Sequence, residues 1–122
     1  MRKALYSSLV VFSFAIIFAS GCSKDNGGGG GGGASVDCAT VTNKAFAADI
    51  SPITQTICAV AGCHAAGSFN GPGALTNYAQ ISAAASSIKT AVSSGRMPQG
   101  SSLSASQKNS IICWVNGGAP NN

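Results

Sequence analysis

The segment Cys58-Ala59-Val60-Ala61-Gly62-Cys63-His64 constrains this chain more than any other, because it gathers two thiols and an imidazole within a few residues. His64 is the only histidine in the sequence. Gly, Ala and Ser are abundant and only 8% of the residues are charged, so the expected helices carry few large apolar side chains. A small domain of this composition has a thin core, and a large group bound at this segment would supply the missing volume.

The residue types of this segment suit covalent attachment of haem. In that chemistry two cysteine sulfurs add to the two vinyl groups, and the histidine after the second cysteine binds the iron. The commoner attachment motif has two residues between the cysteines, whereas four lie here, so the extra pair must loop outward. Gly62 gives the backbone the freedom that this loop needs. The sequence therefore predicts one haem c attached to Cys58 and Cys63, with His64 as an axial ligand of the iron.

Two other interpretations of the segment stay open. One is a disulfide between Cys58 and Cys63, and the other is a zinc site that adds His64 and a further cysteine, Cys38 or Cys113. In a zinc site the adjacent Cys63 and His64 would both have to reach one tetrahedral ion, which strains the local geometry. In haem attachment the thiol and the imidazole point to different parts of a wide ring, which favours haem.

The sixth coordination position of the iron needs a second donor, because no other histidine is present. Met97 is the expected donor, since it is the only methionine besides Met1 and lies in the loop of residues 95–100, where an apolar side chain has no structural role. Pro98 fixes the local backbone and would hold the thioether toward the iron. Packing of Met97 elsewhere, or a deprotonated Lys89 as the donor, remain as alternatives.

Residues 1–21 have the order of a secretory signal peptide. Two basic residues precede an apolar stretch from Leu9 to Ala19, which is too short to span a bilayer comfortably, and small residues lead to Cys22. The segment resembles the lipobox of bacterial lipoproteins. The resemblance implies that Cys22 is acylated and that the exported protein is anchored in a membrane by lipid.

Residues 22–36 follow as a linker that contains seven consecutive glycines, Gly27 to Gly33. Such a stretch has no side chains to bury and great backbone freedom, so it is expected to be a flexible tether. The folded domain is expected to cover residues 37–122.

Helix signals dominate this domain, and no run of alternating β-branched residues suggests a sheet, so the fold class is expected to be all-α. Ser51-Pro52 is the expected start of a short helix that stops near Cys58. A second short helix is expected to start at Thr76 or Asn77.

Two further helices are expected toward the end of the chain. One runs from about residue 83 to residue 94, before Gly95 ends it. The clearest helix begins at Ser104, where Gln107 completes a capping box, and continues to Gly117-Gly118. Ile111, Trp114 and Val115 form its inward stripe. The Gly-rich loops of residues 62–73 and 95–100 lie between these helices and are expected to carry function.

Cys38 and Cys113 remain once the other three cysteines have been assigned to lipid and haem. In an oxidising compartment they are expected to form a disulfide that ties the start of the domain to its last helix. A free, buried Cys113 is the alternative.

Three further residues are candidates for contacts with the haem propionates. Trp114 is expected in the core, and its indole N–H needs an acceptor there, which a propionate could provide. The same holds for the hydroxyl of Tyr78. Arg96 could pair with a propionate, or lie on the loop as a solvated charge.

Five basic residues and three aspartates remain after the signal peptide, a net charge of +2, which two haem propionates would bring to about zero. No basic run is present, so nucleic acid is not expected as a partner.

The motifs Asp49-Ile50-Ser51-Pro52-Ile53, Gly73-Ala74-Leu75, Met97-Pro98, Leu103-Ser104 and Trp114-Val115-Asn116-Gly117-Gly118-Ala119 accompany the Cys58 to His64 segment. With them, the chain from Phe46 to Ala119 is similar to the small single-haem cytochrome c domains of bacterial lipoproteins, often called planctomycete-type cytochrome c. The resemblance implies an all-α, cytochrome c-like fold of about four to five short helices around one haem. It also implies His64 and Met97 as the axial ligands.

With both axial positions filled, the iron has no vacant site for oxygen or peroxide, so one-electron exchange is the chemistry that remains. The chain is therefore expected to be an electron carrier with redox proteins as partners, not an enzyme, on the periplasmic or cell-surface side of a bacterial membrane. The alternatives are a haem enzyme or gas sensor with an open iron site, and a haem-free or metal-binding disulfide module for surface interactions.

Overall fold

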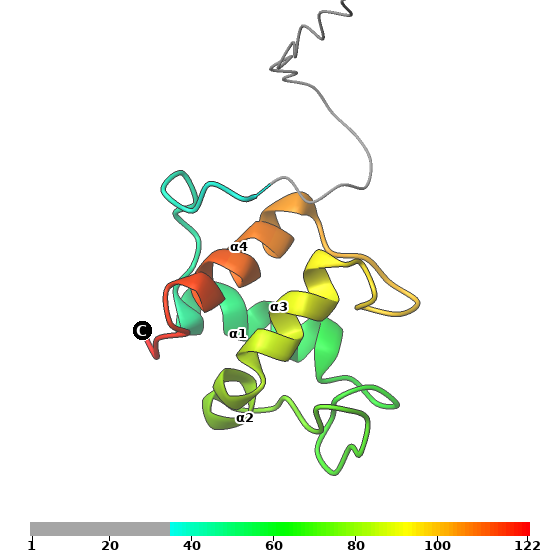
Figure 1. The fold of residues 1–122 in the computed structure, drawn as a ribbon. Helices are drawn as coiled ribbons and strands as arrows, with labels where there is room; N and C mark the ends of the chain where they lie inside the picture. Colours follow the sequence, from blue (N-terminus) through cyan, green and yellow to red (C-terminus); the bar gives the residue numbers. More distant parts are fainter. Residues whose placement is uncertain (1–34) are drawn as a thin grey trace, which may run out of the picture. The chain divides into compact units, whose positions relative to one another are not determined.

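The structure, a computed structural model, describes residues 35–122. Every regular element in this range is a helix (Figure 1), which confirms the prediction of an all-α fold. None of these helices is long and apolar enough to cross a membrane. The predicted signal peptide of residues 1–21, the predicted acylation site Cys22 and the tether up to residue 34 lie outside the described residues.

A continuous helical rod forms the first part of the domain. It consists of η1 (Phe46–Ile50), α1 (Ser51–Ile53) and η2 (Thr54–Cys58), of which η1 and η2 have the wider π-helical turn. The rod ends at Cys58, as predicted. Its predicted start at Ser51 is wrong, because the chain is already helical from Phe46 and Ser51 lies inside the rod without a capping hydrogen bond from its side chain.

The earlier start of the rod has a cause far away in the sequence. The backbone N–H groups of Phe46 and Ala47 donate to the side-chain and main-chain oxygens of Asn122, at 2.9 and 2.8 Å. The carboxylate of Asp49 accepts from the backbone N–H of Ala45 at 2.9 Å. These acceptors satisfy N–H groups that the first turn of a helix leaves without partners, so the rod needs no serine cap at its middle.

The three later helices begin and end close to the predicted residues. They are α2 (Tyr78–Ala83), α3 (Ala85–Ser93) and α4 (Ala105–Asn116). Asn77 is the N-cap of α2 and accepts a hydrogen bond from the backbone N–H of Gln80 at 3.0 Å. Ser104 and Gln107 form the predicted capping box of α4, and Gly95, with φ +71°, follows the end of α3.

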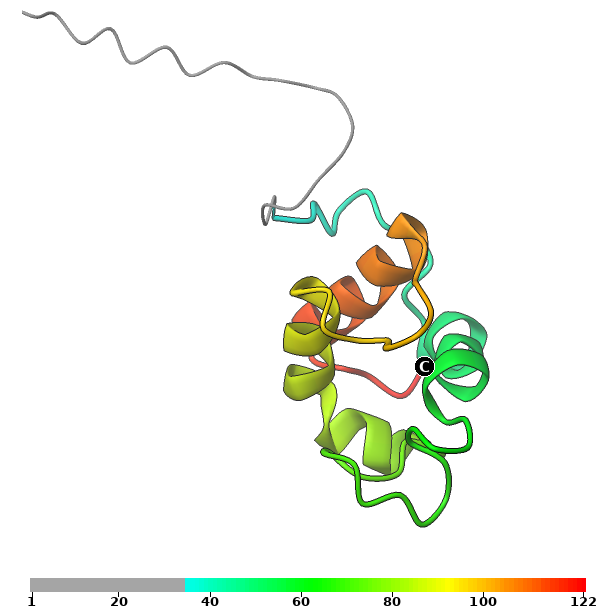
Figure 2. The ribbon, with the colours of Figure 1, turned by 90° about the vertical axis from the view of Figure 1, so that its right-hand side faces the viewer.

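The helices enclose one apolar core. The helix α4 packs against α3 and against η1 of the rod (Figures 1 and 2). Of the predicted inward stripe of α4, Ile111 and Trp114 are both only 1% exposed, whereas Val115 is partly buried and packs against the edge of the core. The Phe46 ring lies edge-on to the Tyr78 ring, with a centroid distance of 4.9 Å, and 5.8 Å from the centroid of Trp114. These aromatic rings provide much of the core volume that the small residues cannot, because each buries a large apolar area.

The chain after α4 turns back across this core toward the rod (Figure 2). Trp114 donates from its indole N–H to the carbonyl oxygen of Pro120 at 2.9 Å, and the Tyr78 hydroxyl donates to the carbonyl oxygen of Ala119 at 2.9 Å. Both polar groups therefore have partners within the protein, as buried donors require.

Cys38 and Cys113 are joined by a disulfide, which confirms the predicted pair. Cys113 is buried on α4, whereas Cys38 lies in the segment before the rod. The side-chain nitrogen of Lys44 donates to the carbonyl oxygen of Cys38 at 2.8 Å and holds the same segment a second time. The bond spans a sequence separation of 75 residues. A cross-link over so long a loop stabilises a fold mainly by restricting the unfolded chain.

Removal of this disulfide with Cys38→Ala and Cys113→Ala is expected to lower the free energy of unfolding by about 2–4 kcal/mol, because the unfolded chain regains its freedom. Urea unfolding of the purified protein measures the change. For comparison, Ser104→Ala removes only a helix cap and is expected to cost about 1 kcal/mol. A double variant that unfolds at the same urea concentration as the unchanged protein would contradict the expectation.

Candidate functional site

A cavity of about 700 Å³ opens between the end of the rod, the loop that follows it, α3 and the loop after α3. The residues that line it include Cys58, Cys63, His64, Arg96 and Met97. Its apolar lining includes Ile57, Leu75, Ile88 and Ala91. The structure therefore brings together both predicted thioether cysteines, both predicted axial ligands and the arginine that was a candidate for a propionate contact.

His64 is buried where the chain leaves the rod and turns toward α2. Its backbone N–H donates to the carbonyl oxygen of Cys58 at 2.9 Å, and its own carbonyl oxygen accepts from the N–H of Leu75 at 2.9 Å. These two bonds fix the histidine backbone between the end of the rod and the residues that lead into α2.

The imidazole of His64 is oriented by a hydrogen bond of 2.8 Å between Nδ1 and the carbonyl oxygen of Gly73. A carbonyl oxygen can only accept, so Nδ1 carries the proton and Nε2 keeps its lone pair. Among the described residues no buried side-chain nitrogen lacks a hydrogen-bond partner, so Nε2, which has none, is open to the cavity. Metal-bound histidines in proteins are commonly held in this way, with the second ring nitrogen donating to a backbone carbonyl.

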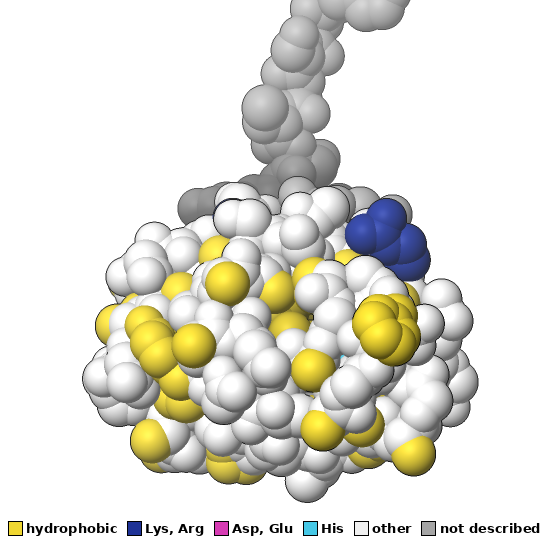
Figure 3. Space-filling model, turned by 90° about the horizontal axis from the view of Figure 1, so that it is seen from below, with side chains coloured by type: hydrophobic (Ala, Val, Ile, Leu, Met, Phe, Trp, Pro, Cys, Tyr) yellow, Lys and Arg dark blue, Asp and Glu magenta, His cyan; other side chains and the backbone are white. Residues whose placement is uncertain are grey.

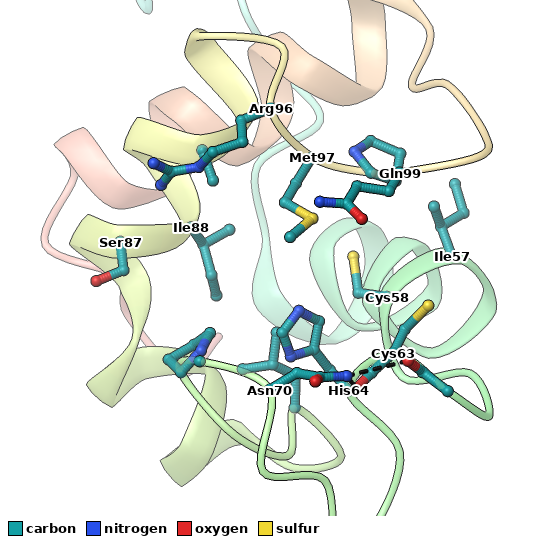
Figure 4. A pocket seen from close by; sticks show the side chains of 16 residues that line it. Ile57, Cys58, Cys63, His64, Asn70, Ser87, Ile88, Arg96, Met97 and Gln99 are labelled. Atoms are coloured by element: carbon teal, nitrogen blue, oxygen red, sulfur yellow. Dashed lines mark hydrogen bonds between the residues drawn. The ribbon is translucent and has the colours of Figure 1, made fainter.

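Met97 lies across the cavity from His64 (Figure 4). The Met97 side chain extends from the loop after α3 and its sulfur points toward the imidazole ring. The backbone N–H of Met97 donates to the carbonyl oxygen of Ala91 at 3.1 Å, which holds the start of this loop against α3. The thioether and the imidazole therefore face each other from two separate loops, as two axial ligands of one metal would.

The thiols of Cys58 and Cys63 lie on the side of the cavity formed by the rod (Figure 4). Both cysteines are free in the structure, so the alternative of a disulfide between them is not what the fold contains. Burial raises the pKa of the Cys58 thiol above its ordinary value, and the neighbouring Cys63 adds to the effect. A raised pKa keeps this sulfur in the protonated thiol form, which is a poor nucleophile and a poor metal ligand.

The two extra residues between the cysteines are accommodated by an outward turn of the loop. Gly62 has φ +80° at this turn, which is the left-handed conformation that glycine adopts at least cost. The side-chain nitrogen of Asn70 donates to the carbonyl oxygens of Gly62 and Cys63, both at 3.0 Å, and the Ser68 hydroxyl donates to Cys63 as well. The wide spacing is thus built into an ordered, hydrogen-bonded loop.

Some of the predicted contacts lie elsewhere. The donors of Tyr78 and Trp114 are bonded to the carbonyl oxygens of Ala119 and Pro120, and neither residue lines the cavity, so the structure does not bring them to a propionate. Lys89 donates to the side chain of Asn116 on α4 and also does not line the cavity, so it is not in place as an alternative donor.

Cys38 and Cys113 cannot provide the further sulfur ligand of the alternative zinc site, because they are bonded to each other. Within residues 35–122 no three His, Cys, Asp or Glu side chains are grouped so as to hold a metal ion.

Two residues of the site were missed by the analysis of the sequence. Gly73 supplies the carbonyl that orients His64, and Asn70 fixes the turn of the attachment loop. A backbone acceptor leaves no signal in the sequence, and an asparagine in a Gly-rich loop is ordinary turn composition.

Comparison with family models, with curated proteins and with solved structures finds no match to this chain.

Gly73→Ala tests the orientation of the imidazole. Gly73 has φ +102°, and an added Cβ would meet only the Ser68 carbonyl oxygen at an ordinary 3.7 Å, so the cost arises from the backbone conformation and not from a clash. We expect a loss of about 1–2 kcal/mol in the free energy of unfolding. We also expect faster hydrogen exchange of the Nδ1–H of His64 in NMR spectra, because its acceptor is displaced.

Gly71→Ala is the matched control, since Gly71 has no positive φ and nothing lies within 4 Å of an added Cβ. Equal stability and equal exchange in the two variants would show that Gly73 does not hold the ring.

Proposed function

We propose that the domain is a c-type cytochrome, with a cytochrome c-like fold, that carries single electrons through one covalently attached haem. One observation supports this most strongly. Cys58, Cys63, His64 and Met97, which the sequence analysis chose for haem attachment and for axial ligation, all line the same cavity. They come from two loops and the end of a helix, so their meeting is a property of the whole fold.

The cavity suits a haem in its size and its lining. Its volume of about 700 Å³ lies within the range of roughly 300–1,000 Å³ that is usual for cofactor sites. Apolar side chains from the rod and α3 line it, as the faces of a porphyrin require. The Nε2 lone pair of His64 and the thioether of Met97 are the donors that iron takes in many cytochromes c.

When bound, haem supplies a reversible one-electron iron couple, and the chain's own residues set its position and environment. Each of the two cysteines would form an S–C bond to one carbon of a vinyl group, and its thiol hydrogen would go to the other carbon of the same group. His64 and Met97 would hold the iron, and the thioether of Met97 would raise the reduction potential, as methionine ligation does in other cytochromes c. Arg96, at the rim, is available to a carboxylate of the haem.

Because His64 and Met97 would leave no open position on the iron, the protein carries electrons between redox proteins and is not itself an enzyme. Its proposed place is outside the cytoplasm. The signal peptide of residues 1–21 and acylation of Cys22 would deliver it to the outer side of a bacterial membrane, and the glycine tether would leave the domain free to reach its partners.

The first test is the mass and the spectrum of the mature protein. We expect one haem per chain in the intact mass, and a pyridine haemochrome spectrum typical of two thioethers. Cys58→Ser or Cys63→Ser is expected to shift this spectrum to that of a single thioether and to lower the yield of loaded protein. The double variant Cys38→Ser with Cys113→Ser is the control, because it removes two cysteines outside the cavity and should keep both thioethers. A colourless product of apoprotein mass, from cells able to attach haem, would refute the proposal.

The second test addresses Met97. Met97→Ala is expected to abolish the weak sulfur-to-iron absorption band at the red end of the visible spectrum. It should also lower the reduction potential by on the order of 0.2 V, a part of the roughly 0.8 V that axial ligands span. Spectroelectrochemical titration measures both. Ser102→Ala, at an exposed position of the same loop, should change neither. An unchanged band in Met97→Ala would assign the sixth ligand to another group, and absence of the band from the unchanged oxidised protein would favour an open-site haem protein.

A further inference from the structure

The distribution of charge along the described chain is uneven. Residues 50–88 contain no Asp, Glu, Lys or Arg, although they form most of the rod, the whole attachment loop, α2 and the start of α3. His64, the one titratable imidazole in this stretch, is buried. The charged residues on either side are Asp49 and Lys89. A surface made from this stretch can therefore neither attract nor repel a partner through net charge of its own.

Phe69 lies in the middle of this uncharged stretch. Its side chain is fully exposed, although phenylalanine is among the residues that folding usually removes from water. The only other large apolar side chain exposed in the described residues is Val60, at 38%, in the same loop. The loop is not loose, because the side chains of Ser68 and Asn70, on both sides of Phe69, hydrogen-bond to the backbone of Gly62 and Cys63. An ordered loop thus presents the phenyl ring to solvent.

This loop is continuous with the rim of the proposed haem cavity. Phe69 is among the residues that line a second, more open hollow of about 310 Å³, which shares Gly62, Cys63 and Asn70 with the main cavity. Figure 3 views the molecule from the end where the loop lies and shows apolar side chains scattered among uncharged atoms around a central hollow. One basic group lies at the edge, and no acidic side chain is visible on the described part of this face.

We propose that the loop of residues 59–73, centred on Phe69, is the surface through which this protein exchanges electrons, and that it fits a redox protein whose own exchange surface is apolar and weakly charged. The inference rests on the proposed function. Cys63, one of the two proposed attachment residues, lies in this loop and lines both hollows, so a partner that binds over Phe69 comes close to the proposed haem. Burial of one exposed aromatic ring supplies an anchor for such a contact.

A protein partner fits this surface better than a lipid bilayer does. Peripheral binding to a membrane usually combines several apolar side chains with basic residues that meet anionic headgroups. The loop has a single large aromatic side chain and no basic residue. Apart from Val60, Asn70 and Pro72, its other exposed residues are Gly or Ala, which suits close approach of a second protein surface.

A second copy of the chain in the opposite oxidation state is a suitable probe, because its own exchange surface is apolar and uncharged. The reduced copy loses one electron and the oxidised copy gains it, so no other reagent is needed, and NMR line broadening gives the rate constant. The full chain is used with Cys22→Ser, so that no acyl chain brings it to lipid. Mass and spectrum first establish that haem is attached, which separates a failure of the proposed function from a failure of the docking surface.

The decisive comparison places the same new charge at two exposed alanines. Ala66→Asp lies in the loop, whereas Ala105→Asp lies at the start of α4, at the opposite end of the domain (Figures 1 and 2). Ala66→Asp is expected to slow exchange about fivefold at 0.01 M salt, because two carboxylates then face each other, and to recover at 1 M salt, where screening acts within about 3 Å. Ala105→Asp is expected to change the rate less than twofold.

Phe69→Ser is expected to slow exchange about fivefold at both salt concentrations, because the apolar anchor is lost and no charge is introduced. Equal rates for Ala66→Asp and Ala105→Asp, or an unchanged rate for Phe69→Ser, would overturn the proposal. Phosphatidylcholine vesicles provide a last measurement. If the vesicles slow electron exchange of the protein with Phe69 but not of the Phe69→Ser variant, the phenyl ring binds to lipid, and the proposal is likewise overturned.

Discussion

The only imidazole of the chain is held by the carbonyl oxygen of Gly73, and the parts of the domain around the cavity meet at this contact. Cys58, where the rod ends, accepts from the backbone of His64, and Leu75, which leads into α2, donates to it. The chain therefore leaves the rod at Cys58 and reaches Leu75 close to the same residue, and the imidazole of His64 lies between these two points. Because the loop closes on the histidine, its other residues can extend outward while the direction of Nε2 stays fixed.

The domain divides its stabilising interactions between two regions. The aromatic rings of Phe46, Tyr78 and Trp114, the disulfide, and the contacts of Asn122 with the rod all lie away from the cavity lining. The cavity lies between the end of the rod, α3 and two loops, and hydrogen bonds hold these loops in shape. A composition rich in Gly, Ala and Ser leaves this second region without an apolar filling of its own. In the proposed holoprotein the haem supplies that filling, and the first region keeps the walls in place.

The sequence predicted best those features whose causes are local. The caps of α2 and α4 are side chains within a few residues of the N–H groups that they satisfy, so Asn77 and the pair Ser104 and Gln107 could be identified from spacing. The disulfide followed from counting cysteines. The start of the rod could not be predicted, because its acceptors are on Asn122, and no local pattern links Phe46 to a residue so distant. The acceptors of Tyr78 and Trp114 were missed for the same reason, since both are backbone carbonyls brought close by the fold.

The wide spacing of the cysteines and the uncharged surface are connected through the same loop. The two additional residues carry the chain outward at Gly62 before it returns to Cys63. The side chains of Asn70 and Ser68 donate hydrogen bonds to the carbonyl oxygens of this turn, so uncharged amide and hydroxyl groups stabilise it. A loop stabilised in this way needs no ion pair near the proposed haem site. Charged side chains in this loop would shift the reduction potential of a bound haem and would make the binding of partners depend on salt concentration. With a neutral loop, the axial ligands have the larger influence on the potential, and apolar contact has the larger influence on partner binding.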